Sequence, residues 1–160
     1  MSQAIIQTAL SARQLVLGSV QQIPEDWYDI QPDAFPNNIR WNIGHMITMM
    51  NWFLTDIEGY QFELPDIYSS IFMTGTKPAD WVTAPPSKDE LLEQLNRQFN
   101  AIEKVPAHVL SQELRSPFLM GPLEFKTAGE VFNFAIVHEG VHLGMISGLA
   151  KLIIHDLQKV

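Results

Sequence analysis

Apolar residues recur every three or four positions in four stretches of the chain, the spacing that places them on one face of an α-helix. Clusters of proline and glycine separate these stretches, which run over about 2–22, 37–59, 87–106 and 127–155. In no stretch do apolar and polar residues alternate regularly enough to predict a β-strand. The pattern therefore predicts four long amphipathic helices.

The starts of the later helices carry capping signals. Ser87 with Glu90, and Thr127 with Glu130, have the three-residue spacing of a capping box, in which each side chain binds the backbone of the other. Asn37 or Asn38 is the expected N-cap of the second helix, because asparagine accepts a hydrogen bond from a free N–H of the first turn.

The helices are joined by uneven connections. Residues 59–86 form a long link with a short helix expected around 65–73, and residues 106–126 form a second long link. Four helices with these connections predict an all-α, antiparallel four-helix bundle that occupies residues 1–160 as one domain. Links of this length often help to cover a functional site.

Composition narrows the classes of function. Ten basic against eighteen acidic residues give a net charge of −8, which disfavours nucleic acids and anionic membrane surfaces as partners. The chain has no cysteine, so disulfides, thiolate metal sites and cysteine nucleophiles are excluded. It shows neither the pattern of a signal peptide nor an apolar run long enough to span a membrane, so we expect a cytoplasmic protein.

The first helix is almost free of charge, since Arg13 is the only charged residue before Pro24. One interpretation is an ordinary helix whose outer face is solvated by glutamines. The other is a helix partly covered by a second subunit.

The last helix contains the strongest chemical signal, His138 and His142. Residues four apart lie about 40° from each other around a helix, so both imidazoles point the same way, along the apolar stripe that should be buried. Buried imidazoles need partners for their nitrogens, and a divalent metal would satisfy both. The alternatives are a pair of core histidines bonded to neighbours or a pair that lines a wet pocket.

The segment His138–His142 also matches the H-E-x-x-H pattern of zinc peptidases, in which the glutamate is the general base. No further histidine follows closely, and no strand-rich segment is available to bind a peptide, so a peptidase is disfavoured. Glu139 lies about 100° around the helix from His138. It could reach the edge of the site or a neighbouring helix.

A third ligand is expected upstream at His45. On a helix this residue shares a face with Trp41, Met49, Trp52 and Asp56, and Gly44 beside it would allow another element to approach closely. Three histidines from two helices would form an open set that leaves positions for water or substrate. Imidazole ligands suit Zn, Ni, Cu, Co or Fe.

The element at Trp41–His45, followed about ninety residues later by His138–Gly144, resembles the DinB-like (DinB/YfiT-like) superfamily. The resemblance covers nearly the whole chain. It implies an up-down-down-up four-helix bundle, often dimeric, in which His45, His138 and His142 bind one divalent metal, usually zinc or nickel. We therefore expect a homodimer with one such site per chain, walled by Trp41 and Trp52.

The resemblance implies two activities. Some relatives transfer a low-molecular-weight thiol such as bacillithiol or mycothiol to a small electrophile, and others are described as metal-dependent hydrolases. In hydrolysis, where the metal would activate a water, Glu139 or Asp56 could serve as the general base or as a polar partner of the metal ligands. Many relatives have glutamine where this chain has Met145, which puts a polar role of that position in doubt. A non-catalytic protein that binds a metal or small ligand, and a helical interaction module with structural histidines, remain alternatives.

Overall fold

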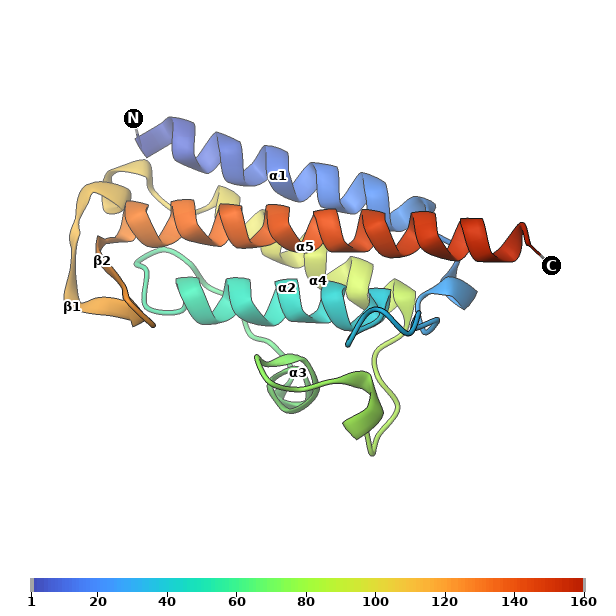
Figure 1. The fold of residues 1–160 in the computed structure, drawn as a ribbon. Coiled ribbons are helices and arrows are strands. Elements are labelled where there is room, and N and C mark those ends of the chain that lie inside the picture. Colours follow the sequence, from blue (N-terminus) through green and yellow to red (C-terminus); the bar gives the residue numbers. More distant parts are fainter. Residues whose placement is uncertain (1, 160) are drawn as a thin grey trace.

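The computed structural model describes residues 2–159, which form five α-helices, three short 3₁₀ helices and one two-stranded sheet in this part of the chain (Figure 1). In chain order the elements are α1 (Ser2–Gln22), η1 (Glu25–Trp27), α2 (Ile39–Leu54), α3 (Asp66–Phe72), η2 (Pro78–Asp80), α4 (Lys88–Glu103), η3 (Ala107–Ser111), β1 (Glu113–Met120), β2 (Leu123–Thr127) and α5 (Ala128–Leu157). None of the helices in residues 2–159 is both long and apolar enough to cross a membrane.

The helix starts follow the capping signals of the sequence. Asn38 caps α2 by accepting a hydrogen bond from the backbone N–H of Trp41 at 2.8 Å. Both predicted capping boxes are present, one before α4 and one before α5. The second helix ends at Leu54, before the predicted end at Gly59.

The four long helices pack as a closed ring, in which α1 contacts α4 and α5, and α2 contacts the same two helices (Figure 1). The apolar core between them has two halves. One half, toward the β-hairpin, includes Leu10 and Phe132, and the other includes Val16 and Leu149. The two halves meet near the middle of the helices.

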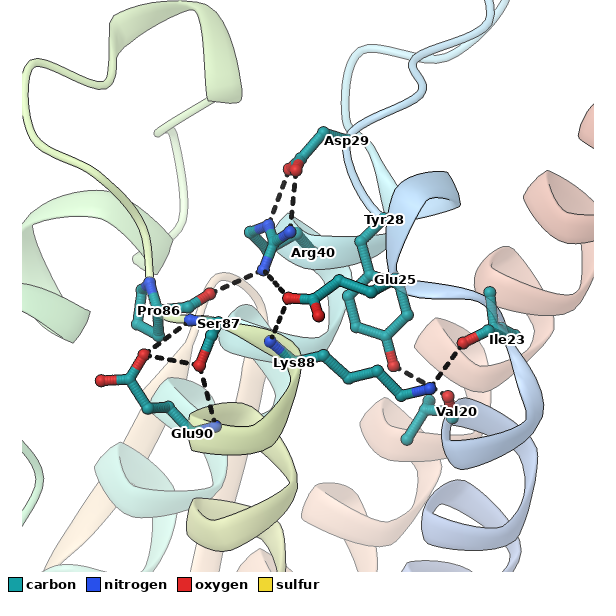
Figure 2. A network of polar contacts seen from close by, with 10 residues as sticks. All are labelled: Val20, Ile23, Glu25, Tyr28, Asp29, Arg40, Pro86, Ser87, Lys88 and Glu90. Atoms are coloured by element: carbon teal, nitrogen blue, oxygen red, sulfur yellow. Dashed lines mark hydrogen bonds and ion pairs between the residues drawn. The ribbon is translucent and has the colours of Figure 1, made fainter.

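Arg40 anchors the start of α2 to two loops (Figure 2). Its guanidinium donates two hydrogen bonds of 2.7 Å to the carboxylate of Asp29 and a third, also of 2.7 Å, to the backbone oxygen of Pro86. In the same network Lys88 donates to the backbone oxygen of Ile23, 2.7 Å away, just beyond the end of α1. These bonds fix the N-terminal turn of α2, which leads directly into the segment that carries Trp41 and His45.

The sheet is a correction to the predicted all-α fold. Strands β1 and β2 pair as an antiparallel hairpin. They lie in the second long link, residues 106–126, which the sequence predicts to contain no strand, and β2 ends one residue later at Thr127. Most of their residues are exposed, so the alternation of apolar and polar residues that marks a half-buried strand is weak here. The turn contains Gly121 at φ +58°, a left-handed conformation that glycine adopts without strain.

The short helix α3 confirms the helix expected around residues 65–73, and it packs against α2. The contact is close at Gly44, where a Cβ atom would lie 2.5 Å from the ring carbons of Phe72. Gly44 thus permits the close approach that its position beside His45 had suggested.

We expect Gly44→Ala to destabilise the protein by about 1–3 kcal/mol, because the added methyl group must displace the buried Phe72 ring. Urea unfolding measures the difference. The matched control is Gly140→Ala, also in the interior of a helix but with no atom within 4 Å of the new Cβ. That change should stabilise by up to about 1 kcal/mol through helix propensity. Equal effects at both positions would contradict the packing argument.

Candidate metal centre

The structure brings His45 of α2 together with His138 and His142 of α5. Each offers one ring nitrogen, and the three nitrogens all lie within 4.8 Å of one another. His45 is 4% exposed, whereas the rings of His138 and His142 are half-buried. The histidine triad therefore has one side toward the core and one side that reaches the surface.

His45 is held by two neighbours. Its Nδ1 lies 2.6 Å from the backbone oxygen of Phe72. A carbonyl can only accept, so Nδ1 carries the proton and Nε2 keeps its lone pair. The indole of Trp41 stacks on the imidazole with ring centroids 4.4 Å apart and an angle of 13° between the planes. Trp41 is itself fixed by a hydrogen bond of 2.9 Å from its Nε1 to the hydroxyl of Thr76.

His142 is oriented in the same way by an amide. Its Nδ1 lies 2.9 Å from Oδ1 of Asn42, one turn before His45. The Nδ2 of Asn42 donates to the backbone oxygen of Asn38, so Oδ1 is the acceptor that faces the imidazole. His142 therefore also donates from Nδ1 and presents an unprotonated Nε2.

His138 contacts rings rather than hydrogen-bonding groups. Its imidazole lies edge-to-face with Phe53, at 5.4 Å between centroids, and 4.5 Å from the ring of His142. Among the described residues it has no hydrogen-bond partner. Packing against these rings sets the orientation of His138. A bound metal ion or other ligand would give its ring nitrogen a polar partner.

All three imidazoles favour the neutral form. Burial lowers the pKa of His45 below its usual value, and burial together with the neighbouring imidazoles lowers the pKa of His138 to about 4 and that of His142 to about 3. A neutral imidazole is the form that coordinates a metal. At neutral pH the triad needs no deprotonation before it can bind one.

The donor set fits a divalent transition metal. Three neutral nitrogens, two of them oriented through Nδ1 hydrogen bonds, are the arrangement in which histidine binds zinc and its neighbours. Within the described residues no carboxylate joins the group. An ion held by three protein ligands keeps open positions, which is typical of catalytic rather than structural sites.

Replacement of Asn42 by leucine should lower metal affinity by about 10- to 100-fold, because the imidazole of His142 loses the acceptor that fixes its orientation. Titration of the metal-free protein with zinc against a competing chelator measures the change. Asn51→Leu is the control, because Asn51 lies on the same helix and, in the described part of the chain, forms no hydrogen bond with a histidine of the triad. An Asn42→Leu variant with wild-type affinity would contradict this role.

The lowered pKa values predict the pH dependence of the metal-free protein. The unfolded chain binds protons at its histidines near pH 6.5, whereas folded His138 and His142 remain neutral down to about pH 4 and 3. The unfolded state therefore holds more protons between these values, so stability is complete above pH 6.5 and falls as the pH is lowered from there. Urea unfolding with chelator at pH 7.5, 6.0 and 5.0 should show this decline. Its slope should be smaller in His142→Phe.

Glu139 does not join the triad but points into the core toward α1. Its carboxylate forms an ion pair with Arg13 of α1, with 2.6 Å between Oε1 and Nε, and both side chains are almost wholly buried. The geometry is not that of a linear hydrogen bond, and within residues 2–159 Arg13 Nη2 and Glu139 Oε2 have no hydrogen-bond partner. Burial raises the pKa of Glu139, and the charge of Arg13 opposes this rise.

The ion pair belongs to a polar layer that crosses the core between its two apolar halves. Arg13 donates from Nη1 to Oε1 of Gln98 on α4 at 2.9 Å. Gln98 in turn donates to the backbone oxygen of Ile47 at 2.8 Å and lies 3.3 Å from the hydroxyl of Tyr60. With the triad, every long helix contributes a polar group at this level.

Two other predicted site residues, Trp52 and Asp56, line a hollow beside β1 whose lining includes none of the three histidines. Trp52 is 40% exposed, and its ring packs on Phe118 of β1 with 4.9 Å between centroids. Asp56 lines the same hollow beside β1. Met145, the position where many relatives have glutamine, is 38% exposed. Of the two tryptophans expected to wall the site, Trp41 stacks on a histidine of the triad.

Asn42, Phe72 and Arg13 were not among the sequence candidates for roles at the site. For Asn42 a signal was present, since it precedes His45 by three residues and faces the same neighbouring helix. The lone charge of Arg13 on the apolar face of its helix was another signal, because it requires a buried partner. The carbonyl of Phe72 carries no sequence signal, since every residue has one.

Residues 9–146 match the family model of the DinB superfamily, which covers most of the chain and includes all three histidines. No curated protein matches the sequence.

Proposed function

The chain belongs to the DinB superfamily, and from this premise we propose that it binds one divalent metal ion, zinc or nickel, through His45, His138 and His142. We propose further that it is an enzyme that transfers a low-molecular-weight thiol, of the bacillithiol or mycothiol type, to a small electrophile. The observation that carries this proposal is the meeting of three neutral ring nitrogens within 4.8 Å, one on a buried imidazole and two on half-buried ones.

The site favours an external nucleophile. When bound, the metal would supply Lewis acidity, which lowers the pKa of a thiol or of water. The chain has no cysteine, so any thiol must come from outside. The half-buried imidazoles of His138 and His142 reach the surface, while Trp41 and Phe72 lie against His45.

The residues near the triad make hydrolysis the second candidate. A hydrolase activates water with the help of a general base, and the two carboxylates expected for that role lie elsewhere. Glu139 is paired with Arg13, and Asp56 lines the hollow beside β1. Thiol transfer needs no such base, because the proton of the thiol can pass to solvent.

The proposed transfer is a substitution at carbon. The sulfur of the thiol forms a new bond to the electrophilic carbon, and the leaving group departs with the electron pair of its broken bond. The thiol proton goes to water, so no oxidant or reductant is required. His45, His138 and His142 contribute by holding their ring nitrogens unprotonated and correctly oriented throughout.

The test is an assay of the zinc- and nickel-loaded protein with bacillithiol or mycothiol and 1-chloro-2,4-dinitrobenzene, following chloride release. We expect turnover that requires both the thiol and the metal and that is lost in His138→Ala. A parallel assay with 4-nitrophenyl acetate and no thiol tests hydrolysis. Metal binding without turnover in either assay would favour the non-catalytic binding protein, and absence of metal binding would overturn the whole proposal.

We propose also that the four long helices form the bundle implied by the family and that the chain pairs with a second copy. The surface that supports pairing is the outer side of α5, where Val137 and Val141 are 61% and 58% exposed. Between Glu130 and Lys151 no charged residue of α5 is exposed, so two acidic chains could meet there without like charges in contact. Sedimentation equilibrium at micromolar concentration tests the pairing, and a monomer would overturn it.

A further inference from the structure

A cavity of about 1010 Å³ lies outside the triad, between the end of α2, strand β1 and the start of α5. Its apolar lining includes the buried Phe53, Ile57 and Val131 and the more exposed rings of Trp52 and Phe118. Cavities of this volume hold small organic molecules, and exposed indole and phenyl rings are effective contacts for apolar or aromatic groups.

The cavity lies further along α2 from the face that carries His45. Trp52 follows His45 by seven residues, two helical turns, so it lies on the same face about 10 Å further along the axis. Phe53 joins the two regions, with its ring centroid 5.4 Å from that of His138 and 5.9 Å from that of Phe118. A molecule about 10 Å long could contact the rings of the cavity at one end and reach the half-buried histidines of the triad at the other.

The charged residues around the cavity favour a ligand with a positive charge. Asp56, Glu58 and Glu113 line it and are exposed, against the single cation Arg115. Among the described residues none of these four takes part in an ion pair, so the rim has an unneutralised excess of negative charge. A cationic ligand gains from this field and an anionic one loses, more so at low ionic strength.

We infer that this cavity binds the organic body of the substrate, and that this body is an aromatic or aliphatic group that carries an amine. The assignment of the ligand as the substrate rests on the proposed function of the triad. The binding itself does not, because no histidine of the triad lines the cavity.

The test compares 4-phenylbutylamine with 4-phenylbutyrate, which share one apolar body and differ in the sign of their charge. Calorimetric titration uses the metal-free protein, residues 1–160, at low salt, because an amine could otherwise coordinate a bound metal. We expect saturable binding of the amine, about tenfold tighter than that of the carboxylate. The difference should shrink in 0.5 M NaCl.

Variants locate the site. Trp52→Ala should weaken binding of the amine by about tenfold, whereas Trp27→Phe, on a ring at the other end of the molecule, should leave it unchanged. Asp56→Asn combined with Glu58→Gln should reduce the preference for the amine while the apolar body still binds.

Each contrary result has a distinct meaning. Failure of both probes to bind overturns the cavity as a binding site, and equal binding of both overturns its preference for a cation. Binding unaffected by Trp52→Ala, or seen only with metal and lost in His138→Ala, places the amine elsewhere and overturns the inference. If the amine binds as expected and the protein holds no metal, the proposed function fails while this site stands.

Discussion

His142→Ala is expected to reduce the bound metal from about one ion per chain to almost none, with affinity lowered by more than about 100-fold. The reason is that loss of a direct ligand exceeds the 10- to 100-fold effect of losing a group that merely orients one. The remaining two nitrogens, from His45 and His138, come from different helices and would share the ion with additional water. Elemental analysis of protein purified without chelator, followed by zinc titration, measures both quantities.

The fold should survive this change. His142 is half-buried, and in the described part of the chain its hydrogen-bond partner is Asn42. Circular dichroism should therefore be that of the wild-type protein. His155→Ala is the matched control, because His155 lies near the exposed end of the same helix and should leave the metal content unchanged. Wild-type metal content in His142→Ala would rule out the triad as the binding site.

Glu139→Ala should destabilise the protein by about 3–5 kcal/mol, because it leaves the guanidinium of Arg13 charged and without its ionic partner in the core. A loss of this size is a large fraction of the stability of an ordinary domain, typically about 5–15 kcal/mol. Chemical unfolding of the metal-free protein gives the value directly.

The double variant Arg13→Met with Glu139→Leu separates the cost of an unpaired charge from the value of the pair. Replacing both partners by apolar residues of similar volume is commonly neutral or stabilising, so the double variant should recover most of the lost stability. Gln98 would lose one hydrogen-bond donor but keep its bond to the backbone of Ile47. If Glu139→Ala lowers the free energy of unfolding by less than about 1 kcal/mol, its removal does not leave an uncompensated charge on Arg13 in the core, and this prediction is wrong.

The sequence predicted the centre of the site because its signals are local. Helical periodicity alone places His138 and His142 side by side, and His45 stands out as an imidazole on an apolar face. That the three meet depends on the packing of α2 against α5, which the resemblance implied and the structure shows. Metal binding itself stays a prediction.

The surroundings of the site could not be predicted in the same way. Periodicity fixes the direction of a side chain around its helix, but the partner depends on which helix stands in that direction. From the sequence, Glu139 could therefore reach either the edge of the site or a neighbouring helix. In the structure α1 stands in its direction, so its partner is Arg13. Trp52 shares the face of His45, yet a hairpin that the sequence did not predict supplies its neighbour, Phe118.

The spacing of the three ligands along the chain has a consequence for folding. His138 and His142 belong to one helix, whereas His45 lies about 90 residues earlier, so an ion held by all three would close a loop of that length. Such a cross-link limits the freedom of the unfolded chain, as a disulfide does in secreted proteins. In a chain without cysteine, a metal ion is the means available for joining the first half of the sequence to its last helix, and the melting temperature should then rise with the concentration of free metal.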